Sequence, residues 1–422
     1  MKSLLLSIGL LCIITACKPE IKNTSDNSGI EVIKLDPDNA ATFMKFSDIF
    51  SKIEFLPLET NEKCLIGEIS NLLIYEDYIF IADDEITKSV FVFGTDGSFK
   101  YKIAGQGRGP NEYLNLGNMY IEEETRSLVL SCDEDCLFYN IDDGTFIERR
   151  SGKIDYDSIE YVSKDVYAYY ISYGYPKDYK HSLIIDNEGI ISEFFPMPEY
   201  LMGIVPTSRR LFNAYNSDRN LYFTPNYKDT IYQILPDGPK PLRYVDFGDK
   251  KPPEKVLGEV KEKEFMGNKG IDIVTGYGKY CGIIGDYFET SVFYYFKYSY
   301  NSMPYLYLKL KNTEKVIHTQ AYRNTVDDMT FNLLGSFGDF LYAGDSYLAS
   351  YANANEFDNL MEMYLIYNEA FSDGRIPVPK KELESIRESV EKMNEIYGPI
   401  MSELSKKDEN DNPVLVFFHL KD

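Results

Sequence analysis

The strongest constraint on the fold is a turn that recurs along the chain at a nearly constant interval. Its glycine is Gly97, and the next three follow after 47, 45 and 49 residues, at Gly144, Gly189 and Gly238. Asp or Asn with Gly suits β-hairpins, because their tight turns need positive φ. A four-stranded sheet repeated at this period is typical of a β-propeller blade. Unrelated hairpins of a β-sandwich would not keep one spacing.

The segment Gly67–Tyr113 shows what one repeat contains. It holds four short runs rich in Ile, Val, Phe and Tyr, which are Ile69–Tyr75, Tyr78–Ala82, Val90–Phe93 and Phe99–Ala104. Runs this short suit strands and are too short for helices. A single sheet of four antiparallel strands cannot bury both its faces, so it needs copies of itself.

The later repeats indicate six blades and a way to close the ring. Two segments, at about 249–270 and 354–407, interrupt the period and are predicted to be helical insertions. The sixth repeat lacks its outermost strand, while Lys52–Glu59 is a spare strand before the first blade. We expect Ile53–Leu58 to pair with Val414–Leu420, because a borrowed strand removes a frayed edge. The predicted fold is an all-β, six-bladed propeller closed by an N-terminal strand, with a helical insertion in the last blade.

The N-terminus is typical of a secretory signal. Within residues 1–16, the basic Lys2 is followed by the apolar run Leu4–Ile14. This run is too short to span a membrane. The ending before Cys17 resembles a bacterial lipobox, where cleavage leaves the cysteine as the lipidated first residue. The alternative is an ordinary signal that happens to end at a cysteine. We expect residues 17–30 to be a tether and 31–422 the propeller, held by lipid alone at the outer membrane, on its periplasmic or surface face.

Composition narrows the classes of partner. The net charge is −23, from 67 acidic and 44 basic residues, which disfavours nucleic acid and anionic lipid surfaces. The 36 Tyr and 26 Phe fit a β-rich exported protein. The absence of Trp argues mildly against a dedicated glycan platform, although Tyr can serve. We expect a monomer.

The cysteines leave two readings open. Cys132 and Cys136 flank a short loop between two strand-like runs, where a hairpin disulfide and two free thiols are equally plausible. A metal site there would need histidines, and His181, His318 and His419 are distant in sequence. No cofactor is expected, with calcium on loop carboxylates as the alternative.

Four stretches resemble an exported bacterial family of six-bladed β-propeller lipoproteins: Phe46–Ile49, Ile53–Thr60, Gly105–Tyr113 and Asp229–Tyr232. The resemblance covers nearly the whole mature chain. The sequence departs from the family at Asn111, where Gly is common, and in the length of the last helical insertion. Family members are mostly without assigned activity, so the resemblance implies the fold and says little about chemistry.

The glycine link Gly105–Tyr113 has a structural and a functional interpretation. No Lys-Ser/Thr follows its glycines, so a phosphate cradle is disfavoured. In the structural interpretation, the glycines let the chain turn between blades, Arg108 pairs with Glu112, and Tyr113 packs between the blades. In the functional one, these three side chains line the mouth of the ring and bind a sugar-like or carboxylated ligand.

Loops expected on the same face supply the other candidates for ligand binding, which are Asp83, Asp133, Tyr175 and Tyr227. No catalytic residue can be nominated, because no histidine lies in a recognisable motif. The leading hypothesis is a non-catalytic propeller that binds a small molecule, a glycan or an envelope protein. The alternative is a hydrolase or lyase acting on glycans or lactones, with a metal on loop carboxylates.

Overall fold

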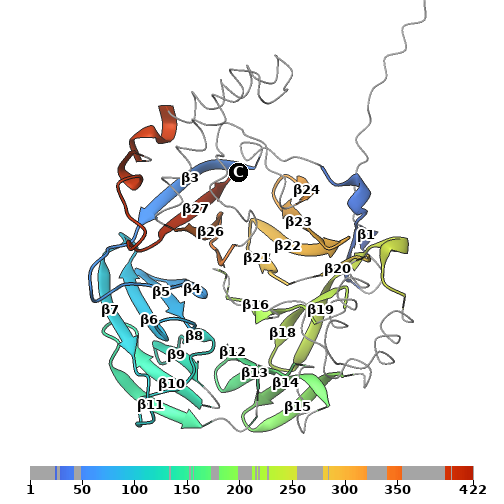
Figure 1. The fold of residues 1–422 in the computed structure, drawn as a ribbon. Helices are drawn as coiled ribbons and strands as arrows, with labels where there is room; N and C mark the ends of the chain where they lie inside the picture. The colour runs from blue at the N-terminus through green and yellow to red at the C-terminus, as the bar shows by residue number, and fades with distance from the viewer. Residues whose placement is uncertain are drawn as a thin grey trace, which may run out of the picture.

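Six sheets form a ring in the computed structural model (Figure 1), which confirms the predicted six-bladed propeller. The structure describes residues 24–25, 29–41, 49–132, 135–151, 154, 156–172, 180–197, 212–213, 216, 219–225, 228–253, 279–283, 285–320, 340–353, 395–400 and 402–421.

Blades 1 to 3 are regular antiparallel meanders. Blade 1 is β4 (Asn71–Tyr75), β5 (Tyr78–Asp83), β6 (Ser89–Gly94) and β7 (Phe99–Ala104). Blade 2 is β8 (Met119–Glu122), β9 (Ser127–Cys132), β10 (Asp135–Asn140) and β11 (Phe146–Ser151). Blade 3 is β12 (Ser158–Ser163), β13 (Val166–Tyr170), β14 (His181–Asn187) and β15 (Ile190–Pro196).

Blades 4 and 6 contain N-terminal strands as well as their own, and blade 5 lies between them. Blade 4 is β16 (Phe212–Asn213), β17 (Tyr222–Phe223), β18 (Thr230–Leu235) and β19 (Gly238–Asp246), extended by β2 (Glu31–Lys34) and β1 (Thr24–Ser25). Blade 5 is β20 (Gly282–Ile283), β21 (Phe288–Glu289), β22 (Phe293–Tyr300), β23 (Met303–Leu310) and β24 (Val316–Gln320). Blade 6 is β25 (Tyr342–Ala343), β26 (Tyr347–Ala352), β27 (Val414–Leu420) and β3 (Phe50–Pro57).

The recurring turns have the predicted backbone. Gly97, Gly144, Gly189 and Gly238 have φ of 80°, 71°, 89° and 136°, a region that glycine enters without steric cost. In the fifth repeat, which has no glycine at this turn, Glu314 takes a φ of 54°. The interval between turns therefore marks the same hairpin in successive blades.

The ring closes as predicted, because β3 pairs antiparallel with β27. Phe55 lies opposite Val416, and Ile53 lies opposite Phe418. The buried Asn412 side chain secures this seam, since it accepts from Ile66 N and donates to Glu59 O and Cys64 O. Residues more than 340 positions apart in the chain are thus joined in one sheet.

An N-terminal strap, residues 31–41 and 50–57, continues this pairing around the ring, and its first part, residues 31–41, was not predicted. β2 adds to the outer edge of blade 4, parallel to β19. Ala41 then bridges Thr319 on the outer strand of blade 5, and β3 completes blade 6. Three successive blades therefore have their outer edges covered by one segment, which protects edges that would otherwise be open to pairing.

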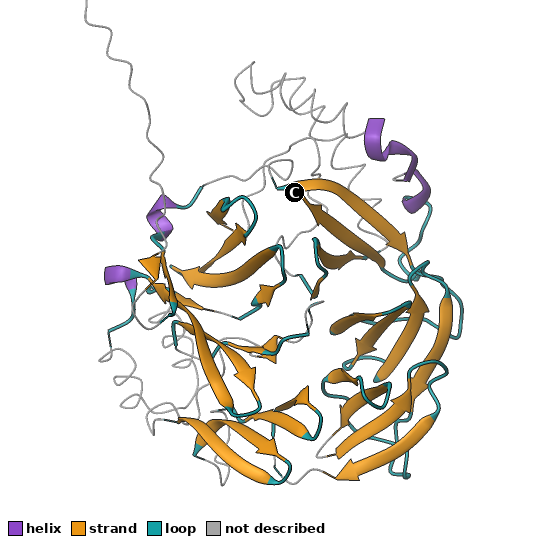
Figure 2. Cartoon of the chain, turned by 180° about the vertical axis from the view of Figure 1, so that it is seen from behind, coloured by secondary structure: helices purple, strands orange, loops and turns teal. Residues whose placement is uncertain are grey.

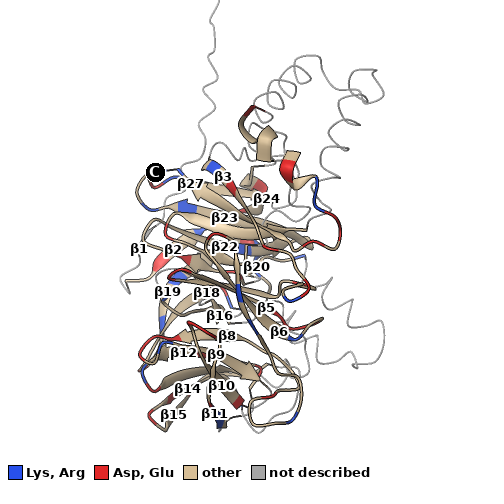
Figure 3. Cartoon of the chain, turned by 90° about the vertical axis from the view of Figure 1, so that its left-hand side faces the viewer, with Lys and Arg blue, Asp and Glu red and all other residues tan. Residues whose placement is uncertain are grey.

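The core lies between neighbouring blades. One buried cluster joins blades 1 and 2 around Phe80 and Leu130, and another joins blades 2 and 3 around Phe138 and Ile184. Strands make up most of the described chain in Figure 2, and Figure 3 shows charged residues mainly in the turns. This arrangement leaves polar turns at the rims of a largely apolar ring.

Helices are few in the described part of the chain. Most of the predicted insertions, 254–278 and 354–394, lies outside the described residues, and helical turns are seen at Gly248–Lys250, 395–400 and 402–404. Tyr397 is buried, and its hydroxyl accepts a hydrogen bond from Ile53 N at 3.0 Å, which ties this helix to the seam. No helix among the described residues is long and apolar enough to cross a bilayer.

Candidate functional site

The glycine link Gly105–Tyr113 folds back on itself between β7 and β8. Gly107 N donates to Tyr113 O at 3.0 Å, and the Glu112 carboxylate accepts from Gly109 N at 2.7 Å. A Cβ on Gly107 would lie 2.0 Å from a carboxylate oxygen of Glu112. A side chain at Gly107 would therefore have to displace the Glu112 carboxylate.

Tyr113 and Arg108 have different environments. Tyr113 is buried between blades 1 and 2, and its hydroxyl donates to Lys88 O at 2.7 Å. Arg108 is exposed and makes no hydrogen bond or ion pair with any residue the structure describes, so the expected pair with Glu112 is not formed. Of the three side chains of this link, Arg108 alone is both charged and free to meet a ligand.

Asp83 holds two loops together. It is fully buried, and one oxygen accepts from Gly67 N at 2.8 Å while the other accepts from Ile86 N at 2.9 Å. It thus ties the loop after β5 to the link that enters blade 1, and both its oxygens are occupied. The other candidates, Cys17, Asp133, Tyr175 and Tyr227, lie outside the described residues.

Cys132 and Cys136 are free thiols, so the hairpin disulfide is not formed. Cys132 packs in the cluster between blades 1 and 2, and Cys136 packs in the cluster between blades 2 and 3. The two side chains therefore lie on opposite faces of one sheet, where no disulfide can join them. Burial also raises the pKa of the Cys136 thiol, which keeps it protonated and weakly nucleophilic.

The histidines and acidic residues do not gather into a metal centre within the described ranges. His318 is buried, and this burial lowers its pKa to about 4. Its ring nitrogen lies 2.6 Å from the Tyr298 hydroxyl. His318 is therefore neutral at physiological pH and packed between strands rather than presented to a substrate.

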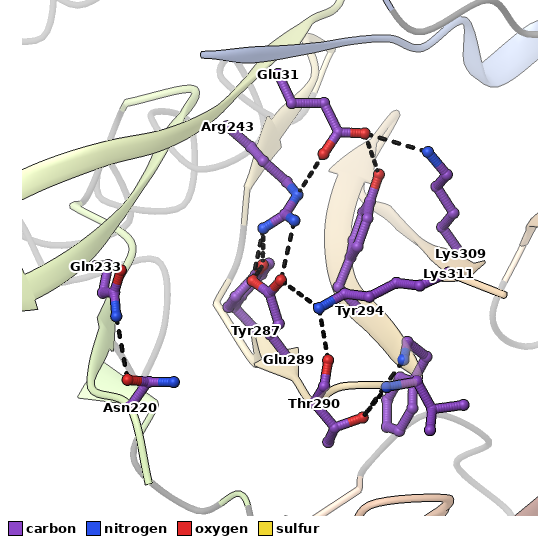
Figure 4. Close-up of polar contacts among 12 residues, drawn as sticks. Glu31, Asn220, Gln233, Arg243, Tyr287, Glu289, Thr290, Tyr294, Lys309 and Lys311 are labelled. Atoms are coloured by element: carbon purple, nitrogen blue, oxygen red, sulfur yellow. Dashed lines mark hydrogen bonds and ion pairs between the residues drawn. The ribbon is translucent and has the colours of Figure 1, made fainter. Parts of the chain in front are cut away.

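A buried charge network joins blades 4 and 5 (Figure 4). Arg243 pairs with Glu31 on the strap at 2.9 Å and with Glu289 on β21 at 2.6 Å. Lys309 and Lys311 approach the same two carboxylates, at 3.3 Å and 2.7 Å. Each of these charged side chains is paired with another one in the network. The network therefore acts as a buried seam between the two blades.

The described residues do form one sizeable groove, between blades 2 and 3. Its volume is about 650 Å³, within the range of ligand pockets. It runs from the end of β11 to the turns that follow β12 and β14. The lining residues come from six strands and two turns, and are Tyr120, Cys136, Phe138, Arg150, Ser151, Ile159, Asp165, Tyr167, Tyr169, Asp186, Glu188 and Gly189.

Aromatic rings form the floor of this interblade groove. Tyr120, Phe138 and Tyr169 are almost fully buried, and the Arg150 guanidinium lies 3.9 Å from the centre of the Phe138 ring. The Tyr167 hydroxyl donates to Glu122 at 2.9 Å. The site therefore combines ring surface with fixed polar groups, which is the make-up of sites for small polar ligands.

Sequence reasoning missed this groove, although a signal was present. Tyr167 and Tyr169 alternate along β13 and thus share one face, as do Cys136 and Phe138 along β10. The sequence does not show which two sheet faces pack against each other and leave a space between them. That depends on blade packing rather than on any single strand.

The ring of six sheets makes the protein a six-bladed β-propeller. The chain belongs to the family described as a domain of unknown function, DUF4934, whose model matches residues 30–419. This membership agrees with the resemblance noted above, including the lack of an assigned activity.

One solved structure shows the same fold, and a second is only weakly similar. A presumed exported protein from Bacteroides fragilis is 16% identical, with a TM-score of 0.66 over 93% of this chain and all of that chain. BamB from Moraxella catarrhalis is 10% identical, with a TM-score of 0.33 over 64% of this chain and 65% of that one. No curated protein matches the chain.

Proposed function

We propose that this chain is a non-catalytic binding propeller of the cell envelope, and that its interblade groove holds a small polar ligand. The observation that carries the proposal is the groove itself. It has a volume of about 650 Å³ and is lined by aromatic rings and polar side chains. The glycine link supports it less well, since Glu112 and Tyr113 are engaged within the fold.

Location at the envelope is supported by the N-terminus. Residues 1–16 have the pattern of a signal peptide, and Cys17 stands where a lipoprotein is cleaved. The structurally similar Bacteroides fragilis protein is described as exported. A lipid on Cys17 would hold the propeller at the membrane through a short tether that ends at the strap.

Binding is favoured over catalysis by the chemistry of the groove. Its lining contains no histidine, and its cysteine is buried with a raised pKa. A hydrolase or lyase would need a group poised to accept a proton or a metal to activate water. That alternative would rest on loop carboxylates such as Asp133, which is outside the described residues.

Filling the groove tests the proposal. Ser151 lines it and is exposed, so Ser151→Trp should block ligand entry with little effect on stability. Ser192→Trp, at an exposed position of β15 that does not line the groove, is the matched control. We expect a ligand found by thermal-shift screening of amines, oligosaccharides and carboxylates to lose at least about tenfold in affinity with S151W alone. Equal affinity in both variants would place the ligand elsewhere.

Replacing Cys17 tests the anchor. Cys17→Ala removes the only thiol that could carry the lipid at the predicted cleavage site, so the protein should leave the membrane fraction and appear in the soluble one. Fractionation and intact-mass measurement of the mature chain give the result. If the mass of the wild-type chain shows no lipid, the predicted anchor is wrong, whereas the proposal for the groove is unaffected.

A further inference from the structure

The far end of the interblade groove is acidic. Asp165 lies in the turn between β12 and β13, and Glu188 in the turn between β14 and β15, which share one face of the ring. Both side chains are exposed, and neither makes an ion pair with a described residue. The largely buried Asp186 lines the groove beside them. Three carboxylates thus line this end of the groove, and one oxygen of Asp186 accepts from Gly189 N at 2.7 Å.

The single cation in the lining is already engaged. Arg150 pairs with Glu148 at 2.6 Å and with Glu122 at 3.4 Å, while its guanidinium covers Phe138. It therefore has little capacity left for an anionic ligand. The lining holds three carboxylates and one guanidinium, and the whole chain carries −23, so we expect a negative potential in the groove.

Ring surface next to these carboxylates favours a particular kind of cation. Tyr167 and Tyr169 line the groove on β13, immediately after the Asp165 turn. An amine or guanidinium gains from an aromatic face as well as from carboxylates, whereas a hydrated metal ion uses only oxygen ligands. Among the described residues, no three acidic, histidine or cysteine side chains are close enough to hold a metal. Arg150 over Phe138 already shows a guanidinium lying on a ring in this groove.

We propose that the ligand of the groove carries a cationic nitrogen, either an amine or a guanidinium, and this rests on the proposed function of the groove. This group lies at the acidic end, near Asp165, Asp186 and Glu188, and the rest of the ligand extends along the tyrosines. The cation can belong to a free small molecule or to a Lys or Arg side chain of a peptide. A carboxylated ligand, which the sequence had suggested for the opposite face of the ring, does not fit this site.

The experiment measures binding of four probes to the full mature chain by calorimetry at low salt. The probes are argininamide and spermidine as small cations, an acetylated and amidated Gly-Arg-Gly peptide as the side-chain form, and maltotriose as a neutral polyol. The test variant is Asp165→Asn with Glu188→Gln. The control is Asp77→Asn with Asp237→Asn, which removes the same charge from exposed turns of blades 1 and 4.

We expect at least one cationic probe to bind, to weaken as salt is raised, and to lose about tenfold or more in affinity in the D165N/E188Q variant but not in the control. Binding of the peptide but not of the small cations would assign the cation to a protein side chain. Maltotriose binding that S151W blocks and D165N/E188Q leaves intact would overturn the cationic assignment but keep the groove as the site. If no probe binds in a way that S151W abolishes, both this assignment and the proposed function fail.

Discussion

A chain that ends at Asn412 is expected to lose cooperative unfolding of the whole propeller. The deletion removes β27, the strand that lies between β26 and β3. Five of its side chains are almost fully buried, namely Val414, Leu415, Val416, Phe418 and Leu420. Each contributes about 1.5–3 kcal/mol, and the total rivals the roughly 5–15 kcal/mol that holds a typical protein folded. Circular dichroism and urea unfolding give the measurement.

A chain that ends at Lys421 is the matched control and should unfold like the wild type, since it keeps all of β27. A finer test is Asn412→Ala, which leaves Ile66 N, Glu59 O and Cys64 O without their side-chain partner. Each lost partner of a buried group costs about 1–3 kcal/mol. A truncated chain that still unfolds in one sharp transition, with a midpoint near that of the wild type, would contradict the role given to this closure.

Local patterns predicted the regular blades well. The strand Tyr78–Asp83 depends on a short apolar run, and the turn at Gly97 depends on a positive φ, so a few adjacent positions are enough to predict each of them. The closure by Ile53–Leu58 followed from counting strands in the last blade. Such features need no knowledge of distant contacts.

The strap over blades 4 and 5 could not be predicted in this way. Glu31–Lys34 is a four-residue strand whose partner, β19, lies more than 200 residues away. Its parallel pairing leaves no turn signal, because parallel strands are not joined by a hairpin. Only the assembled ring shows that this edge is available.

The candidate site was the hardest part to predict. Asp83 and Glu112 have residue types that suit ligand binding, yet backbone amides occupy their oxygens. Conversely, Tyr167 and Glu188 look like ordinary strand and turn residues in the sequence. They become candidates for ligand binding only because blades 2 and 3 leave a groove between them. A side chain's availability depends on its neighbours in space, which one sequence does not reveal.

Replacing Arg243, in the buried seam between blades 4 and 5, is also expected to cause a large loss of stability. Arg243 is 7% exposed and contacts both Glu31 and Glu289. Burial raises the pKa of the Glu289 carboxyl, but Arg243, with help from Lys311 and Tyr287, more than offsets this and holds that pKa below its usual value. Arg243→Met would leave two carboxylates in the interface without their main partner, so we expect a loss of about 3–5 kcal/mol at pH 7.

The pH dependence separates this charge effect from a packing effect. In the wild type, Glu289 contributes stability above its unfolded pKa, and this contribution is lost as the pH falls through the lower folded value. In the R243M variant, burial is no longer offset by the guanidinium, so Glu289 is easier to protonate and the deficit relative to the wild type should shrink between pH 7 and pH 4. The control is Arg126→Met, which breaks an exposed pair with Glu76 and should leave the free energy of unfolding nearly unchanged. Urea unfolding at both pH values decides the matter, since an equal deficit at pH 7 and pH 4 would mean that Arg243 acts through packing alone.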